Sequence, residues 1–399
     1  MKATFWHKAR YWVLLLLVLL ITISSHPTIV DLSRAAGMKS GTILSRYIIL
    51  VFAGLFVMCL NVKSMLKPNL VLVGWVLWIW IFLYYLITFS LFGHKNMMGD
   101  VRSVAICLIA IMIGWQLDLD VKKLRVLLIV FSSLILFVGL MQVFTNVGGF
   151  IILSQYETDN KNSLGVMLVT AAVVFVFMGL NTNRSGVKVL FFAGTVLMLA
   201  VLLTIRARAA TLTSGLMVLY ILYERFKGKN FIWYFLAGIV IFVIIYLILP
   251  GSVKDFVYNS FFQNYEGGDI TSGRAGRNKA ALEFLSYHVL LGNLNQGVDV
   301  GWIHNYPLNR TFEFGIIFVV PIIVLYLYFL IITIQKTIKS DNRNNYNVGY
   351  YALLIPFIIS MVEPTFPFGP GTATVFNFLL FGVALRNTSK EKADIVTVN

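Results

Sequence analysis

Long apolar runs recur from one end of the chain to the other, and short polar segments separate them. As helices, which rise about 1.5 Å per residue, runs of this length suit a hydrocarbon core of about 30 Å. The pattern therefore predicts an all-α polytopic membrane protein with about twelve transmembrane helices. The predicted spans are Tyr11–Ser24, Thr42–Leu60, Asn69–Phe92, Val101–Leu117, Val126–Thr145, Ser163–Leu180, Val187–Thr204, Ala209–Tyr223, Phe231–Leu249, Gly315–Gln335, Val348–Met361 and Thr372–Leu385.

Composition agrees with this fold class. Hydrophobic residues make up 59% of the 399 residues, charged residues only 12%, and the mean hydropathy is +0.83. In a soluble domain about a quarter of the residues are charged. The first run could pass for a signal peptide, but no convincing cleavage site follows it, so we expect a retained helix. Cys59 and Cys107 lie within apolar runs and are predicted to be packing residues.

Lysine and arginine set the predicted orientation, because short cytoplasmic segments are enriched in both. With the N-terminus inside, each cytoplasmic segment carries at least two: Lys2, Lys8 and Arg10; Lys63 and Lys67; Lys122, Lys123 and Arg125; Arg184 and Lys188; Arg225, Lys227 and Lys229; Lys336, Lys339 and Arg343; Arg386, Lys390 and Lys392. Both termini are then cytoplasmic. These cytoplasmic lysines and arginines account for much of the net charge of +15. The charge is therefore no evidence of nucleic-acid binding, and we predict no nucleic-acid partner.

One connection is much longer than the others. Residues 250–314 form a predicted extracytoplasmic loop between helices one to nine (1–249) and helices ten to twelve (315–386), and residues 387–399 form a cytoplasmic tail. Loops of this length in compact proteins are usually functional or disordered. Aromatic residues and an amphipathic stretch at Arg274–Leu291 indicate an ordered, partly helical loop.

Two arginines lie in a tight hairpin on the predicted outer side. Arg206 and Arg208 belong to TIRARAATL, with no acidic residue nearby in the sequence. An arginine at membrane depth costs several kcal/mol and usually faces a cavity or a partner. The alternative is that both side chains extend to anionic headgroups. We favour an outward cavity that binds an anion.

Arg274 and Arg277 share one face of the predicted loop helix at i, i+3, and Thr271 or Ser272 could cap its start. Helix N-termini favour anions, and guanidinium groups bind phosphate oxygens in pairs. The alternative is a basic helix lying on the lipid surface. Together, the four arginines predict a site for a phosphate or a pyrophosphate.

His304 lies in GWIHNYPLNRTFEF, just before the tenth predicted span. Histidine can take a proton from an attacking hydroxyl near neutral pH, although a histidine at a membrane boundary is more often structural. Asn305 could orient a ligand or the imidazole. Glu313 could neutralise an arginine or raise the basicity of His304. In EPTFPFGPGT, Glu363 could pair with an arginine beside a rigid turn.

Three local patterns, in their order along the chain, resemble the O-antigen polymerase and ligase superfamily of polytopic glycosyltransferases. They are an arginine among small residues in a tight hairpin, here Ala207-Arg208-Ala209-Ala210; a Thr-Ser-Gly-Arg turn that opens a loop helix, here Thr271-Ser272-Gly273-Arg274; and His304-Asn305 followed after nine residues by Gly315. Two positions depart from the family pattern, which usually has serine before the hairpin arginine and a small residue or tyrosine at the position of Phe318.

The resemblance implies that a hydroxyl of one glycan attacks C1 of a sugar on undecaprenyl pyrophosphate and releases the lipid pyrophosphate. The one Asp-x-Asp sequence, Asp118-Leu119-Asp120, is predicted to be cytoplasmic, so we expect no metal or cofactor and assign the stabilisation of the leaving group to arginines. The roles implied are pyrophosphate binding by Arg208 and Arg274 with help from Arg206 and Arg277, general-base catalysis by His304, and stacking on sugars by Tyr265, Trp302 and Tyr306.

The expected location is the bacterial cytoplasmic membrane, with the site facing outward. The expected partners are lipid-linked glycan donor and acceptor and membrane lipids, and a chain-length regulator and a flippase are further candidates. A polymerase of O-antigen, capsule or exopolysaccharide units is favoured over a ligase that transfers glycan to lipid A core. A lipid-linked glycan flippase is less favoured, because the sequence shows no inverted halves and no P-loop. A structural membrane protein without activity is the third alternative.

Overall fold

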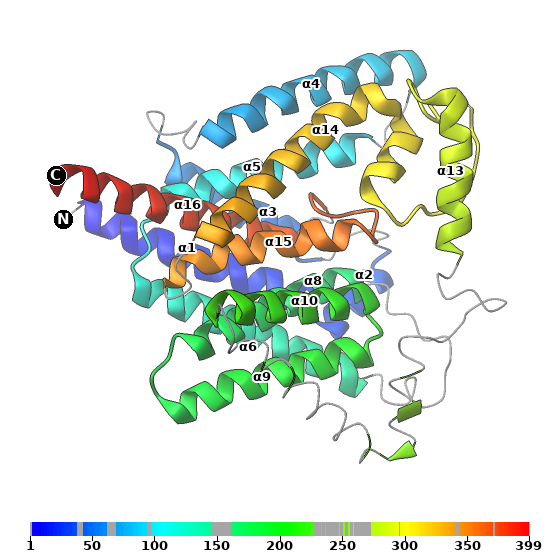
Figure 1. Cartoon of the computed structure of the whole chain (residues 1–399). Helices are drawn as coiled ribbons and strands as arrows, with labels where there is room; N and C mark the ends of the chain where they lie inside the picture. Colours follow the sequence, from blue (N-terminus) through cyan, green and yellow to red (C-terminus); the bar gives the residue numbers. More distant parts are fainter. Residues whose placement is uncertain are drawn as a thin grey trace.

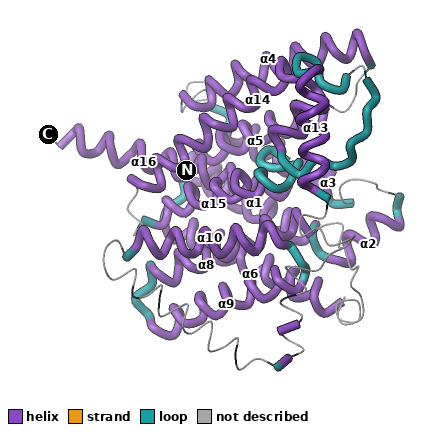
Figure 2. Tube along the Cα trace, turned by 45° about the vertical axis from the view of Figure 1, so that its right-hand side comes forward, coloured by secondary structure: helices purple, strands orange, loops and turns teal. Residues whose placement is uncertain are grey.

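The computed structural model of the chain is a bundle of long helices (Figures 1 and 2), and the described residues are 84% helical with no strand among them. It describes residues 2–37, 43–61, 69–93, 97–145, 161–226, 273–294, 296–339, 344–369 and 372–398, with isolated positions between 233 and 258. The all-α prediction is confirmed over these ranges.

Eleven of the twelve predicted spans overlap a described helix, and the ninth, Phe231–Leu249, lies outside the residues whose fold can be described. The helices are α1 (Lys2–Ser24), α2 (Pro27–Ala35), α3 (Ser45–Cys59), α4 (Asn69–Phe92), α5 (Met97–Gln116), α6 (Val121–Thr145), α8 (Lys161–Leu180), α9 (Ser185–Thr204), α10 (Arg208–Arg225), α13 (Arg274–His288), α14 (Tyr306–Lys339), α15 (Val348–Ser360) and α16 (Thr372–Val398), with a short 3-10 turn at Asn345–Asn347.

In the part of the chain that is described, fewer helices than predicted have the length and apolar composition of a membrane span. Six helices are long and apolar enough to cross a membrane, or up to seven if α1 and α2, which meet at a bend of 72°, form one broken span. The twelve predicted spans are therefore not confirmed. Length is one reason, because α3 and α15 have only 15 and 13 residues, whereas a crossing takes about 20.

The centre of the bundle is α8, whose most apolar stretch is 89% buried, and α6, α9, α10, α15 and α16 pack around it. The most extensive contact between two helices in the described residues is that of α5 with α16. A Cβ atom at Gly114 would collide with the carbonyl oxygen of Leu379, and one at Gly382 would collide with that of Ile111. Glycine is required at both positions because the two backbones touch there.

Figure 1 shows the start of α1 and the end of α16 at the left-hand end of the bundle and α13 lying crosswise at the opposite end. The same left-hand end holds the α5–α6 connection. There, Arg386 binds Asp118 at 3.4 Å and the carbonyl oxygen of Trp115 at 3.0 Å. Hydrogen bonds from the backbone and side chain of Lys123 hold the pKa of Asp120 below its usual range at the start of α6. That this end is cytoplasmic stays a prediction.

The predicted amphipathic helix of the outer loop is present as α13, and it packs along the first turns of α14 through Ala281, Leu285, Ile303 and Phe312. Gly315, with φ 77° and ψ 168°, breaks α14 at the residue where the tenth span was predicted to begin. The N-cap position of α13 is Gly273, in the left-handed region at φ 77°, and the predicted capping residues Thr271 and Ser272 lie outside the described residues.

The segment after α13 is locked to this break in α14. The amide of Asn293 donates to the carbonyl oxygen of Phe312 at 2.8 Å, and the amide of Ile316 donates to that of Val289 at 2.8 Å. A Cβ atom at Gly315 would collide with the backbone of residues 290 and 291. The outer-loop helix and the first turns of α14 therefore form one fixed unit across this end of the bundle.

Candidate functional site

A buried carboxylate, Glu363, gathers side chains from three separate parts of the chain. Its residue is only 5% exposed. Arg274 Nη2 lies 3.5 Å from Glu363 Oε1, and His304 Nδ1 lies 3.9 Å from Oε2. Asn162 Nδ2 donates to Oε2 at 2.9 Å. The structure thus confirms the predicted pairing of Glu363 with an arginine and places the predicted base, His304, beside the same carboxylate.

The turn that carries Glu363 follows α15 and fastens the other two elements. Arg274 Nη1 donates to the carbonyl oxygen of Val362 at 3.1 Å, and Asn305 Nδ2 donates to that of Met361 at 3.2 Å. The N-terminal end of α13 and the start of α14 are therefore both attached to residues 361–363. This arrangement holds Arg274 and His304 on either side of Glu363.

The residue before His304, Ile303, is fully buried against α13. This contact fixes the backbone that carries His304. The His304 side chain is 20% exposed, so one part of the ring is open while its Nδ1 atom is buried and has no hydrogen-bond partner. Catalytic hydrogen bonds are often long in a ligand-free protein and shorten when substrate binds. A small shift of the ring would let Nδ1 donate to Glu363 and leave Nε2 as the proton acceptor.

Asn305 and Tyr306 both make structural contacts at the start of α14. Asn305 Oδ1 accepts from the amide of Leu308 at 3.0 Å and so caps the first turn of α14. Tyr306 is 1% exposed and packs edge-on against Phe368. The expectation that Tyr306 stacks on a sugar is therefore wrong. Trp302 is 70% exposed, and Tyr265 lies outside the described residues.

Glu313 takes one of its two predicted roles and not the other. Its Oε2 atom pairs with Arg310 Nη1 at 2.6 Å, and its Oε1 accepts from Asn309 at 3.1 Å. Arg310 Nε in turn lies 2.9 Å from Oδ1 of Asp100 on α5. Glu313 therefore neutralises an arginine, and the carboxylate beside His304 is Glu363.

The hairpin arginines lie in an unusual turn between α9 and α10. The amides of Arg206 and Ala207 donate to the carbonyl oxygens of Leu203 and Leu202 at 3.1 and 3.2 Å, which is the paired pattern that ends many helices with a left-handed glycine. Here that residue is Arg206, with φ 54°, and among the described residues it is the one non-glycine with positive φ. Such backbone strain is concentrated at functional sites.

Arg208 and Arg274 occupy matching positions in two helices. Each is the first residue of its helix, each helix lacks a side-chain cap at the preceding residue, and neither has an acidic residue in its first turn. No carboxylate in either first turn offsets the positive end of the helix dipole.

The first turns of α8 connect the hairpin to Glu363. Asn162 binds Glu363 from this turn. Gly165, on the next turn, packs against the hairpin, because a Cβ atom there would lie 2.9 Å from that of Ala210 and 3.5 Å from that of Ala207. The hairpin arginines and the Glu363 cluster therefore lie at the same end of the bundle.

Arg277 lies beside two glycines on the side of α13 that faces the segment before His304. A Cβ atom at Gly301 would lie 3.6 Å from Arg277 Cδ, and one at Gly273 would lie 3.4 Å from Nη2. Gly273 and Gly301 have positive φ, at 77° and 72°. The absence of side chains there leaves room for the Arg277 guanidinium along the approach to His304.

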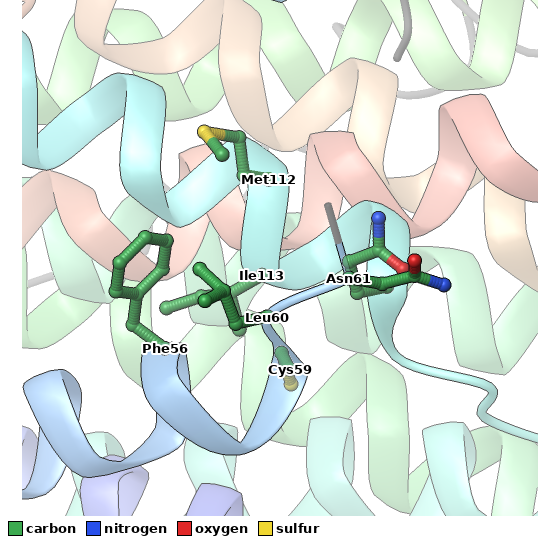
Figure 3. Close-up of a pocket in the computed structure, with 7 residues that line it drawn as sticks. Phe56, Cys59, Leu60, Asn61, Met112 and Ile113 are labelled. Atoms are coloured by element: carbon green, nitrogen blue, oxygen red, sulfur yellow. The ribbon is translucent and has the colours of Figure 1, made fainter. Parts of the chain in front are cut away.

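Sequence reasoning missed Asn162 and the pair of Asp100 with Arg310. Asn162 belongs to the polar run TDNKNS. A polar run of this kind indicates a connection between two helices, but it does not show which side chain Asn162 contacts. A small pocket lined by Phe56, Cys59, Leu60, Asn61, Met112, Ile113 and Gln116 lies where α3 and α5 end, away from His304 (Figure 3). It is not part of the candidate site.

Within the described residues, no three or more His, Cys, Asp or Glu side chains gather as metal ligands would. Comparison with protein-family models gives no match, and a search among characterised proteins gives no significant relative. The resemblance to the polymerase and ligase superfamily therefore rests on the local motifs.

Proposed function

We propose that this protein is a membrane glycosyltransferase that joins lipid pyrophosphate-linked oligosaccharide units into a polysaccharide. The observation that carries the proposal is that a candidate base, His304, and a candidate phosphate ligand, Arg274, lie within 3.9 Å and 3.5 Å of one buried carboxylate. A base and a cation side by side are what an acceptor hydroxyl and an anionic leaving group require.

In the proposed reaction, the acceptor hydroxyl gives its proton to His304 while its oxygen attacks C1 of the donor sugar. The bond from C1 to the pyrophosphate oxygen breaks, and the lipid pyrophosphate leaves with the electron pair. Glu363 holds the imidazole and stabilises the imidazolium that forms. This is the part that a buried carboxylate plays beside a histidine in other enzymes.

The arginines stabilise the departing pyrophosphate. Arg274 and Arg208 stand at helix starts that favour anions, and guanidinium groups bind two phosphate oxygens at a time. Arg277, one turn further along α13, and Arg206, in the hairpin between α9 and α10, add positive charge. Because Arg274 pairs with Glu363 in the free protein, its geometry is set before the substrate arrives, which lowers the cost of reorganisation.

The test replaces His304 by alanine in a cell that makes the polysaccharide. Loss of a general base costs about 10²–10⁴ in rate, so polymer should disappear while lipid-linked single units accumulate. Glu363→Gln keeps the size of the side chain but removes its charge, and it should produce the same accumulation with an equal or smaller loss of rate. His288→Ala, on α13, is the matched control. Polymer of normal amount and length in His304→Ala would contradict the proposal.

A further inference from the structure

The C-terminal end of α13 exposes a group of large apolar side chains, here called the apolar tip. It consists of Leu282, Tyr287, Val289, Leu290 and Leu291, which are 58%, 86%, 45%, 60% and 38% exposed. Ala281 and Leu285 of the same helix are instead buried against Ile303 and Phe312. The exposed side chains of the tip are therefore not the ones that pack α13 against the protein.

Exposure of this kind is restricted to one end of the helix. Towards the N-terminal end, the exposed face carries Lys279, whose side chain is 81% exposed and lies 3.8 Å from Glu283. Exposed apolar side chains that gather in one place mark a surface that meets a protein or a membrane.

The tip adjoins the residue at which α14 begins its apolar span. Val289 accepts a hydrogen bond from the amide of Ile316, and the backbone of Leu290 touches Gly315. From this point α14 exposes an apolar stripe along its length, formed by Ile317, Val320, Val324, Leu327, Ile331, Ile334 and Ile338, each between 38% and 52% exposed. In a helix that crosses a membrane, such a stripe faces lipid. The tip is thus continuous with a lipid-facing surface.

The direction of α13 fits the same partner. Figure 1 shows α13 crosswise to the long helices at the end of the bundle, with its C-terminal end beside α4 and α14 at the edge of the bundle. A helix that lies along a membrane surface buries leucine and aromatic side chains to about 5–10 Å, with tyrosine at headgroup level. The tip likewise consists of leucine, valine and tyrosine side chains, and it lies where the long helices of the bundle end.

We propose that the apolar tip rests in the interfacial region of the lipid leaflet on the His304 side of the membrane. The partner is the bilayer itself. α13 is held to the protein at both ends, by Glu363 and Val362 at Arg274 and by the backbone of α14 beside the tip. A tip at the bilayer surface therefore places Arg274 and Arg277 at a fixed height above that surface. This inference does not depend on the reaction that the site performs.

The test places a nitroxide label at Leu290→Cys in the full-length protein, reconstituted in vesicles of phosphatidylethanolamine and phosphatidylglycerol. Lys279→Cys, on the same helix, is the matched control. Cys59 and Cys107 are 3% and 1% exposed, so the introduced cysteine is the one that reacts. Collision rates with oxygen, which concentrates in lipid, and with a water-soluble nickel chelate are measured by electron paramagnetic resonance.

The label at position 290 should show a ratio of oxygen to nickel collisions severalfold higher than the label at position 279. Equal ratios at the two positions would overturn the proposal, because the tip would then lie in water. Loss of collisions with both reagents at position 290 would also overturn it, because a protein surface, such as a second copy of this chain, would then cover the tip.

Discussion

Arg206 occupies a backbone conformation that favours glycine, at the end of α9. A side chain in the left-handed region costs about 1–2 kcal/mol, and a residue selected only for stability would be glycine. The sequence showed that Arg206 and Arg208 stand in a tight hairpin, and the family motif was matched to Arg208. The structure distinguishes the two arginines. Arg206, with its positive φ, follows the end of α9, whereas Arg208 is the first residue of α10.

Arg206→Gly should therefore separate stability from function. The substitution relieves the strained conformation, so the melting temperature in detergent should be unchanged or higher, since the greater freedom of the unfolded glycine offsets part of the gain. Polymer formation should fall, because one guanidinium of the proposed pyrophosphate site is lost. Arg206→Lys keeps the charge without the fork and should retain part of the activity. Full activity of Arg206→Gly would show that this guanidinium has no part in the reaction.

Glu363 shows what a single sequence leaves undecided at the scale of residues. Glu313 and Glu363 were both candidates for pairing with an arginine, and raising the basicity of His304 was the alternative role for Glu313. In the structure, Glu313 pairs with Arg310 on its own helix, and the carboxylate beside His304 is Glu363, from the turn after α15. Contacts between distant segments depend on how helices pack, which no local pattern records.

The junction of α13 with α14 is the feature that matters most at the scale of elements. The amphipathic pattern predicted α13, and the change from polar to apolar residues predicted the boundary at Gly315. The sequence could not show that Gly292 and Gly315 meet through space, although a Cβ at Gly292 would lie 2.5 Å from the amide nitrogen of Gly315. The conformation of Gly315, with φ 77° and ψ 168°, belongs to a region that is essentially restricted to glycine.

Gly315→Ala should consequently be among the most damaging small substitutions in this unit. It combines backbone strain of about 1–3 kcal/mol with a collision against residues 290 and 291, so the melting temperature should fall and α13 should lose its fixed position. Gly297→Ala is the matched control, because Gly297 also has positive φ, at 63°, but a Cβ there would meet nothing within 4 Å. Equal melting temperatures for the two variants would show that the junction is not tightly packed.

For the whole molecule, the sequence predicted the helical fold and the placement of eleven apolar helices, because hydrophobic runs of helical length report directly on burial in protein or lipid. An apolar run of helical length does not by itself prove that the helix crosses a membrane. α8, the most buried of the candidate spans, and α4, which is largely exposed, are almost equally apolar in sequence, so hydropathy alone does not distinguish the centre of a bundle from its exposed side. The gathering of Arg274, His304 and Glu363 at one end agrees with the predicted order of the spans.

The most direct test of the central claim is elongation by the purified protein. Lipid pyrophosphate-linked repeat unit is supplied in detergent, where no second compartment exists, and the glycan lengths are separated by electrophoresis. The account predicts a ladder of longer glycans with the native chain, release of the lipid pyrophosphate, and single units only with His304→Ala. Native protein that leaves single units unchanged would contradict the account.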